Sequence, residues 1–386
     1  MKILRLAILF SMILFLLSAC DENSTEGAKE YYPLLEVEAE TEYDLGFAVG
    51  ERFAENINNS LDINEDLMAT INQIIAVDSI YFYQQLLDTA EEEMPDMVAE
   101  LHGMCDGSGA EFRSVFMLNI FGEIIALYYG TQNRDIEIPE QMPLGCSDVL
   151  YKYENKIYLS HNEDGFAGLK DYMFLVKAKL PGKPEFISFN YPCMVLGVGP
   201  TVNDAGIAIS NNYIQASAGD AEGIPAYFVN RKLIEFSNIQ EITDFIATKR
   251  IVNCLNCNIA SINENRIISM EMASDSYSLH EVNGLYAHTN HIVHTDMLSH
   301  PVVIDDSTIV RYQTLQELFS EYETHLQDVN LETMHSFLNA VVAVADPNGG
   351  ITTGATLSSS IFDFESMTWR LYFNNPNDDL YQEIEF

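Results

Sequence analysis

The sequence predicts a layered α+β fold, and three observations support this. Residues 43–121 repeat apolar side chains at spacings of three and four, which is typical of helices that bury one face. After residue 146, short apolar runs bounded by turn residues predict strands. The strands alternate in groups with further helical stretches, an order typical of layered α and β elements.

The predicted elements follow one another in chain order. The helical region, exemplified by residues 94–101, ends before a Gly- and Pro-containing stretch at residues 130–143, which we interpret as a linker open to cleavage. Strands are then expected near 149–151, 157–159, 172–176, 186–189 and 207–209, helices at 227–236 and 239–249, strands at 258–262, 267–272 and 276–281, helices at 310–322 and 331–342, and strands at 356–362 and 369–373.

The first residues resemble an export signal. Lys2 and Arg5 precede the apolar residues 6–17, and Ser18-Ala19-Cys20 follows as a lipobox. We expect residues 1–19 to be removed and residues 20–39 to form a lipidated N-terminus and tether, which places a bacterial lipoprotein on the outer side of a cell-envelope membrane through Cys20. An ordinary signal peptide with a chance cysteine is the alternative.

Charge narrows the choice of partners. The chain has 19 Lys and Arg against 58 Asp and Glu, a net charge of -39, so nucleic acid is excluded as a partner. We interpret the excess as a solvated acidic surface. Calcium capture is an alternative, although no acidic run has the spacing of a calcium loop.

Candidate chemistry gathers around Cys146. It follows Gly145 where the helical region gives way to strands, and the polar residues 161–165 end a predicted strand shortly after it. Residues 203–212 form a turn and a strand that ends in two amides, and Asn290 offers another. Neutral amide donors suit an oxyanion hole, because they stabilise the negative charge that develops when an acyl carbonyl is attacked.

Together these residues resemble the acyl-coenzyme A:6-aminopenicillanic acid (isopenicillin N) acyltransferase family. Its relatives are penicillin V acylase, choloylglycine hydrolase and acid ceramidase, all of them N-terminal nucleophile hydrolases. The resemblance runs from about residue 40 to the C-terminus. It is carried by Leu45, Gly46, Gly50, residues 100–109, Leu118, Asn119, Glu123, Gly145, Cys146, Ser147, Asn162, Asp164, residues 203–212, Glu271, residues 288–291, Ser307, Arg311 and Tyr312.

The resemblance implies a four-layer αββα sandwich and self-cleavage. Cys146 would attack the carbonyl of Gly145, dividing a helical pro-segment at 40–145 from a catalytic chain at 146–386. The freed α-amino group of Cys146 would act as the base. An α-amino group titrates at about 7.7 and a thiol at about 8.5, so the two can exchange a proton near neutral pH.

The resemblance also implies roles for other side chains. Asp164 would hold the new ammonium group, Asn212 and Asn290 would bind the oxyanion, and Arg311 would organise the carboxylates around Cys146. His161 stands where the family commonly has arginine, which points to weaker or pH-sensitive activity. A direct catalytic role for His161 and an inert substitution both stay open.

The implied function is cleavage or transfer of the acyl group of a small non-peptide amide through an acyl-enzyme, without a cofactor. An exported location favours hydrolysis over transfer, and the oligomeric state stays open. One alternative is a non-catalytic ligand-binding lipoprotein that keeps the same fold. Another is a solute-binding lipoprotein of unrelated fold, which leaves the Gly145-Cys146 junction unexplained.

Two further cysteine and histidine patterns need an interpretation. His288, His291, His294 and His300, with Cys254 and Cys257, offer a zinc alternative. The thiol pair lacks a matching second pair, so no metal is predicted. In an oxidising compartment Cys105, Cys193, Cys254 and Cys257 can form up to two disulfides of open connectivity.

Overall fold

The computed structural model describes residues 32–132, 135–138, 145–345, 354–373 and 380–386. The predicted signal, the tether up to residue 31 and the lipidation site Cys20 lie outside the described residues, as does part of the linker at 130–143. The first part of the described chain is mainly helical, as predicted. It comprises β1 (Leu34–Glu38), α1 (Glu42–Arg52), α2 (Ala54–Ile63), α3 (Glu65–Val77), the π-helix η1 (Ile80–Gln84), α4 (Gln85–Glu93), α5 (Pro95–Ser108) and α6 (Phe112–Gly130).

Glycines let α1 and α5 pack almost backbone to backbone. A Cβ on Gly46 would lie 1.9 Å from the carbonyl oxygen of Glu100, and one on Gly103 would lie 2.0 Å from that of Tyr43. Gly50 and Gly107 meet the partner helix in the same way, one turn further along. The glycines that carry the family resemblance in this region therefore permit a close helix crossing.

Helix α6 is long and apolar enough to cross a membrane by length and composition. Most of it is buried inside the fold, as in the core helix of a globular protein. It lies against α3, α5 and α7 (Ala226–Leu233) and contacts strand β8 (Ile251–Ser261). Its burial is therefore explained by packing within the protein.

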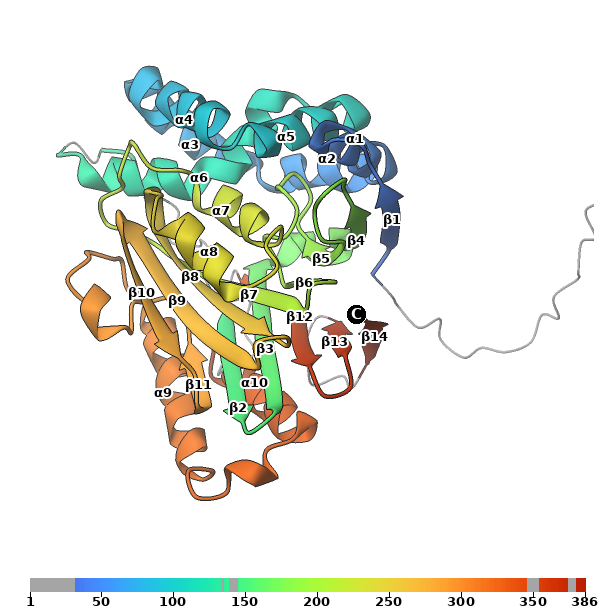
Figure 1. Ribbon diagram of the computed structural model, residues 1–386. Coiled ribbons are helices and arrows are strands. Elements are labelled where there is room, and N and C mark those ends of the chain that lie inside the picture. The colour runs from blue at the N-terminus through green and yellow to red at the C-terminus, as the bar shows by residue number, and fades with distance from the viewer. Residues whose placement is uncertain (1–31, 133–134, 139–144, 346–353, 374–379) are drawn as a thin grey trace, which may run out of the picture. The chain divides into compact units, whose positions relative to one another are not determined.

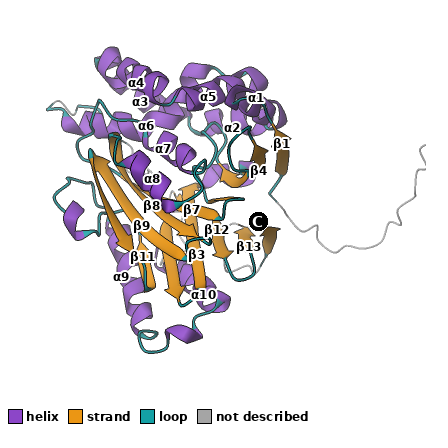
Figure 2. Cartoon of the chain, in the orientation of Figure 1, coloured by secondary structure: helices purple, strands orange, loops and turns teal. Residues whose placement is uncertain are grey.

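The strands form two sheets (Figures 1 and 2). The eight-stranded sheet has the order β1-β4-β5-β6-β7-β8-β9-β10, and the six-stranded sheet has the order β11-β2-β3-β12-β13-β14. Only the pairing of β1 with β4 is parallel among the described strands. The remaining bounds are β2 (Ser147–Tyr153), β3 (Lys156–Phe166), β4 (Phe174–Lys179), β5 (Phe186–Asn190), β6 (Thr201–Asn203), β7 (Ile207–Ile214), β9 (Arg266–Ser274), β10 (Ser276–Glu281), β11 (Gly284–His288), β12 (Gly354–Asp363), β13 (Thr368–Phe373) and β14 (Tyr381–Glu385).

Alternation along β2 shows how the layers meet. Val149 and Tyr151 pack in an apolar cluster with α9 (Asp306–Ser320) and α10 (Leu331–Ala345). Asp148, on the opposite face, bonds to side chains of β7 in the other sheet. The six-stranded sheet thus has helices on one face and the eight-stranded sheet on the other. Helices α6 and α7 lie against β8 of the eight-stranded sheet, and α8 (Ile239–Ile246) follows α7. The predicted α+β class is confirmed.

Several strands escape prediction. β1 and β14 have alternating half-exposed side chains, β6 has three residues, and β11 precedes the polar residues 289–291. The strand expected at 172–176 begins only at Phe174, after the 3-10 helix η2 (Ala167–Tyr172). The polar residues 161–165, expected to end the strand, lie within β3, which continues to Phe166, so their side chains stand in the sheet.

The disulfides that the sequence leaves open are not formed by the described cysteines. Cys105, Cys146, Cys193, Cys254 and Cys257 are all free and buried. Cys254 and Cys257 belong to different apolar clusters, because an odd spacing along a strand places two side chains on opposite faces of the sheet. A bridge or a shared metal between these two is therefore excluded by their directions.

Candidate active site

Cys146 lies immediately before β2 and is 8% exposed. Its Sγ is 3.5 Å from Oε1 of Glu163, to which the thiol donates, and 3.9 Å from the carbonyl oxygen of Asp164. Burial raises the pKa of the thiol to about 12, and the neighbouring Glu163 carboxylate adds to this effect. In the uncut chain the thiol is therefore neutral.

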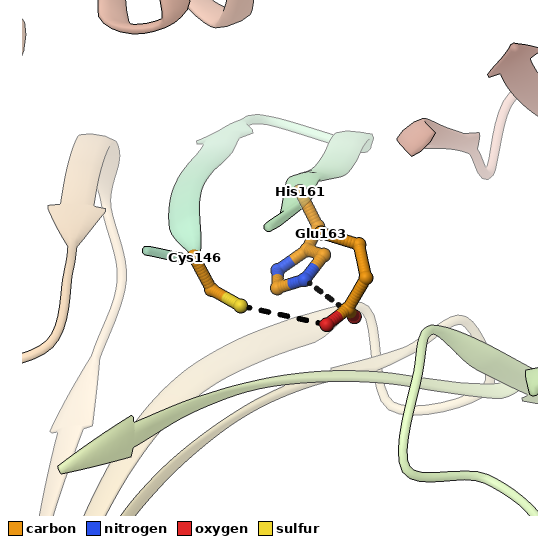
Figure 3. A group of neighbouring side chains, drawn as sticks. All are labelled: Cys146, His161 and Glu163. Carbon is orange, nitrogen blue, oxygen red and sulfur yellow. Dashed lines mark hydrogen bonds and ion pairs between the residues drawn. The ribbon is translucent and has the colours of Figure 1, made fainter. Parts of the chain in front are cut away.

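A line of buried polar groups extends from the thiol into the space between the sheets (Figure 3). Glu163 Oε2 is 3.1 Å from His161 Nε2, and His161 Nδ1 is 3.0 Å from Asp148 Oδ1. The sheet dictates this order: residues two apart on β3 share a face, and His161 stands opposite Asp148 in the β2–β3 register. Burial opposes the imidazolium, but the Asp148 carboxylate outweighs it, so the pKa of His161 is raised well above its usual value.

The sequence-predicted Asn212 belongs to this interior network. Its Nδ2 donates to Asp148 Oδ2 and, over 3.1 Å, to Asn256 Oδ1, and Ser210 Oγ donates to Asp148 over 2.5 Å. Asn212 does not line the cavity beside Cys146, whereas its neighbour Asn211 does. Adjacent residues of a strand face opposite ways, and this alternation separates the two amides.

Arg311 and Asn290 hold the backbone around the thiol. Arg311 Nη1 donates to the carbonyl oxygen of Cys146 over 2.6 Å and to Ser147 Oγ over 2.8 Å, while Nη2 donates to Asn290 Oδ1 over 2.9 Å. Asn290 Nδ2 donates to the carbonyl oxygen of Tyr213. The buried guanidinium thus binds the backbone of Cys146, the residue that follows the expected cleavage point. It makes no close ion pair with a carboxylate in the described part of the chain.

Asp164 packs against Gly145. A Cβ on Gly145 would lie 2.8 Å from Asp164 Cβ and 2.9 Å from its Oδ2, so only glycine fits beside this carboxyl group. Thr356 Oγ1 donates to the other carboxyl oxygen over 2.7 Å. Burial raises the pKa of Asp164 to about 6, although the charge of Arg311 opposes the shift.

A cavity opens beside these groups. Cys146, Glu163 and Asp164 form its polar end. Its other described walls are mostly apolar and aromatic: Leu67, Leu118, Phe121, Phe166, Leu169, Tyr191, Pro192, Met194, Val198, Tyr213 and Tyr227. The remaining lining residues are Gly165, Asn211, Asn290 and a second polar group, formed by Ser60 on α2 and Asn64 just after it.

Buried polar side chains of the helical region fix one wall of the cavity. Residues 191–198, which supply Tyr191 and Met194, are held through their backbone. Leu196 N donates to Glu100 Oε1 and Val195 N to Asn119 Oδ1, each over 2.9 Å. Asn190, at the end of β5, adds a third contact, because its Oδ1 accepts from Gly197 N over 3.0 Å. Glu100 also pairs with the buried Arg231 over 2.7 Å.

Glu123 fixes the start of α7, the helix that carries the cavity residue Tyr227. Its Oε1 accepts from Ala226 N over 2.9 Å at the start of that helix. Burial raises the pKa of this carboxyl group to about 7. Helical residues that carry the family resemblance therefore position the cavity walls but do not hydrogen-bond to the thiol of Cys146.

The histidine-rich segment is explained by local structure. Glu271 accepts from His288 Nε2 over 2.8 Å and from the backbone of Val293 and His294, which fixes the loop that carries Asn290. Burial lowers the pKa values of His291 and His294 to about 4. Within the described residues, these histidines do not form a close set of metal ligands.

Sequence reasoning assigned no individual role to four of the groups that gather here: Asp148, Glu163, Tyr191 and Asn211. Tyr191 donates to Glu163 Oε1 over 2.6 Å. Residues 161–165 were expected at the end of a strand, and the period-two spacing of His161 and Glu163 next to an apolar strand was the available signal that both side chains share a face. Nothing in the sequence pattern indicates that Tyr191 would reach Glu163.

A buried thiol flanked by carboxylates and amides, at the polar end of a mostly apolar cavity, is the kind of site that enzymes use on acyl compounds. Residues 151–378 match the family described as Acyl-coenzyme A:6-aminopenicillanic acid acyl-transferase. The chain belongs to this family. The match begins just after Cys146 and includes His161, Asp164, Asn290 and Arg311.

A curated relative matches almost the whole chain. It is the Beta-alanyl-dopamine/carcinine hydrolase of Drosophila melanogaster, 25% identical over 365 residues, which cover 88% of this chain and 92% of the relative. The alignment therefore extends well beyond residues 151–378. Family and relative together support an enzyme that acts on acyl compounds, a hydrolase or an acyltransferase.

Proposed function

We propose that the protein is a self-processing amidohydrolase with an αββα sandwich of the N-terminal nucleophile type, in which Cys146 is the nucleophile. One observation carries the proposal. The Cys146 thiol faces a mostly apolar cavity and follows a glycine that packs directly against the Asp164 carboxyl group. Cleavage after Gly145 would release the α-amino group of Cys146 beside its own thiol.

The self-cleavage step uses groups that already touch the thiol. Cys146 Sγ attacks the carbonyl carbon of Gly145, Glu163 accepts the thiol proton, and the bond from that carbon to Cys146 N breaks as a thioester forms. The nitrogen leaves as an amine after taking up a proton. Water then hydrolyses the thioester to the Gly145 carboxylate and the free thiol. Arg311 fixes the carbonyl group of Cys146 while the peptide bond between Gly145 and Cys146 breaks.

Turnover repeats this chemistry on a substrate amide. The free α-amino group takes the thiol proton, Sγ forms an acyl-enzyme, the substrate amine leaves, and water releases the acid. Asp164 then serves as the counter-ion of the protonated amine.

We propose Asn290 and Asn211, in place of Asn212, as the oxyanion donors. Both line the cavity, and each side-chain nitrogen makes one bond to a backbone carbonyl among the described residues. The second N–H of each amide is then available for a substrate oxygen.

We propose small amides with an aromatic or apolar part as substrates. The relative's name specifies beta-alanyl-dopamine and carcinine, and the walls of the cavity here include Phe121, Tyr213 and Tyr227. Ser60 and Asn64 offer hydrogen bonds to a polar end of the substrate. Water is the proposed acyl acceptor.

Mass spectrometry of the purified chain tests self-processing. We expect two fragments, the second beginning at Cys146, and a single chain for Cys146→Ala. A panel of beta-alanyl-dopamine, carcinine, N-acyl amino acids and acyl-lactams then tests turnover, with Cys105→Ala as the matched control. Cys105 is a buried thiol on α5, so its loss should change neither result. An uncut wild-type chain that is inert toward the whole panel would falsify the proposal.

A non-catalytic binding protein of the same fold is the second candidate. The observation in its favour is the thiol pKa of about 12, which leaves the uncut chain without a thiolate near neutral pH. Calorimetry separates the two candidates. A binding protein would give a stable complex with an intact amide from an uncut chain, whereas the enzyme would give the separated acid and amine.

We also propose that the mature protein is anchored to a membrane of the cell envelope by lipid on Cys20. The support is the charged start, apolar run and Ser18-Ala19-Cys20 ending of residues 1–20. Radiolabelled palmitate should enter the wild-type protein in a bacterial host and should be absent from Cys20→Ala. Labelling of both proteins would overturn the lipobox assignment.

A further inference from the structure

We propose that Cys146, His161 and Glu163 form a binding site for a divalent cation of the zinc type. The three ligand atoms, one sulfur, one imidazole nitrogen and one carboxylate oxygen, lie within 4.8 Å of one another. All three residues are buried (Figure 3). Metal binding does not depend on the proposed hydrolase activity, although both use the same thiol.

The distances suit a tetrahedral ion. Zinc holds sulfur at about 2.3 Å and nitrogen or oxygen at about 2.0–2.2 Å, so neighbouring ligand atoms are roughly 3–4 Å apart. Here Cys146 Sγ is 3.5 Å from Glu163 Oε1, and His161 Nε2 is 3.1 Å from Glu163 Oε2. The two distances end on different oxygens of Glu163, so a rotation of that carboxylate would bring one oxygen to an ion held by the other two ligands.

The imidazole is already oriented as a ligand. Asp148 Oδ1 lies 3.0 Å from His161 Nδ1 and accepts from it, so Nε2 is the nitrogen directed at the site, and an ion would displace the Nε2 proton. Asp148 is itself fixed by Ser210 and Asn212. A carboxylate that orients a ligating histidine through its second nitrogen is the usual support of a zinc site, and its loss commonly weakens affinity about 10- to 100-fold.

The fourth position would face the cavity. Cys146 and Glu163 both line the cavity, so water or a substrate atom can complete the tetrahedron. Sulfur, nitrogen and carboxylate oxygen together favour zinc or cobalt over magnesium or calcium, which prefer oxygen ligands alone. A bound ion would occupy the nucleophile and inhibit amide cleavage until a chelator removed it.

Cobalt(II) absorption tests the site on the whole purified chain without any substrate. We expect one equivalent of cobalt to give a thiolate-to-cobalt band in the near-ultraviolet and visible bands typical of tetrahedral cobalt, both abolished by zinc. Cys146→Ser should lose the thiolate band, His161→Arg and Glu163→Gln should lose tight binding, and Cys105→Ala should match the wild type. Asp148→Asn should weaken zinc about 10- to 100-fold.

The outcomes separate this proposal from the proposed function. Absence of the thiolate band from the folded wild type, or its persistence in Cys146→Ser, overturns the metal site. Amide hydrolysis measured in the presence of a chelator stands or falls independently of that band. Circular dichroism checks that each variant is folded, and Glu163→Gln, which keeps the size of the side chain, gives a second test should His161→Arg not fold.

Discussion

Replacing His161 by glutamine removes the cation between two buried carboxylates. In the wild type, His161 bonds to Asp148 over 3.0 Å and to Glu163 over 3.1 Å, and the side chains of His161 and Asp148 are 0% exposed. Glutamine is similar in size but neutral, and it can donate to only one of the two carboxylates with good geometry. The substitution therefore isolates the charge and one hydrogen bond.

The expected loss is about 2–3 kcal/mol in the free energy of unfolding. Removing one partner of a buried ion pair costs about 3–5 kcal/mol, because the other charge is left buried without a counter-charge. Glutamine restores part of this through one hydrogen bond to a charged group. Each carboxylate also keeps other donors, Ser210 and Asn212 for Asp148 and Tyr191 for Glu163. Arginine at 161 keeps the charge, so its cost should be confined to about 1–3 kcal/mol of overpacking.

Urea unfolding followed by the fluorescence of the single tryptophan, the buried Trp369, measures the loss. His325→Gln is the matched control, because the His325 side chain is exposed and bonds only to its neighbour Thr324 among the described residues. This variant should stay within about 0.5 kcal/mol of the wild type. If His161→Gln were as stable as His325→Gln, the buried network would contribute nothing and the reasoning would fail.

Three other substitutions test the support of the site. Gly103→Ala should lower the free energy of unfolding in urea by about 1–3 kcal/mol, because its Cβ would lie 2.0 Å from a backbone atom. Gly130→Ala is the control: its Cβ would lie 3.6 Å from the nearest atom, so this variant should lose less than about 0.5 kcal/mol. Glu123 has its pKa raised to about 7, so its stabilising effect is complete below about pH 4 and is lost as the pH rises through 7. Glu123→Gln should therefore gain up to about 3 kcal/mol on the wild type between pH 5 and 8, and an unchanged difference refutes this. Asn119→Ala should raise the KM for an amide substrate roughly tenfold by loosening residues 191–198 and leave cleavage at Gly145 intact; an unaltered KM would contradict that role.

The helical region could be predicted because its apolar spacing is regular and long. The strands could be located where apolar runs were bounded by turns, as at β10, whose predicted and observed bounds coincide. β1 and β14 could not, because edge strands bury only part of one face and their composition resembles that of loops. The parallel pairing of β1 with β4 joins residues far apart in the chain, and no local pattern records it.

The site was predictable in its parts but not in its directions. Cys146, Asp164, Asn290 and Arg311 do gather around the Gly145 junction. Asn212 was chosen from two adjacent amides, and only the register of β7 against its neighbours tells which one faces the cavity. Placing Asn212 at the cavity instead would require a register shift of one residue in β7, and such a shift turns every side chain of a strand to the opposite face.

Before cleavage, the base in contact with the thiol is the Glu163 carboxylate, which the proposed self-cleavage uses once. Burial and the Glu163 carboxylate keep the thiol protonated, and Glu163 also bonds to Tyr191 and His161. An α-amino group titrating at about 7.7 would be a far better matched base for repeated turnover. The proposed cleavage after Gly145 would supply this α-amino group beside the thiol. The proposed activation and the proposed catalysis therefore depend on breaking the same bond.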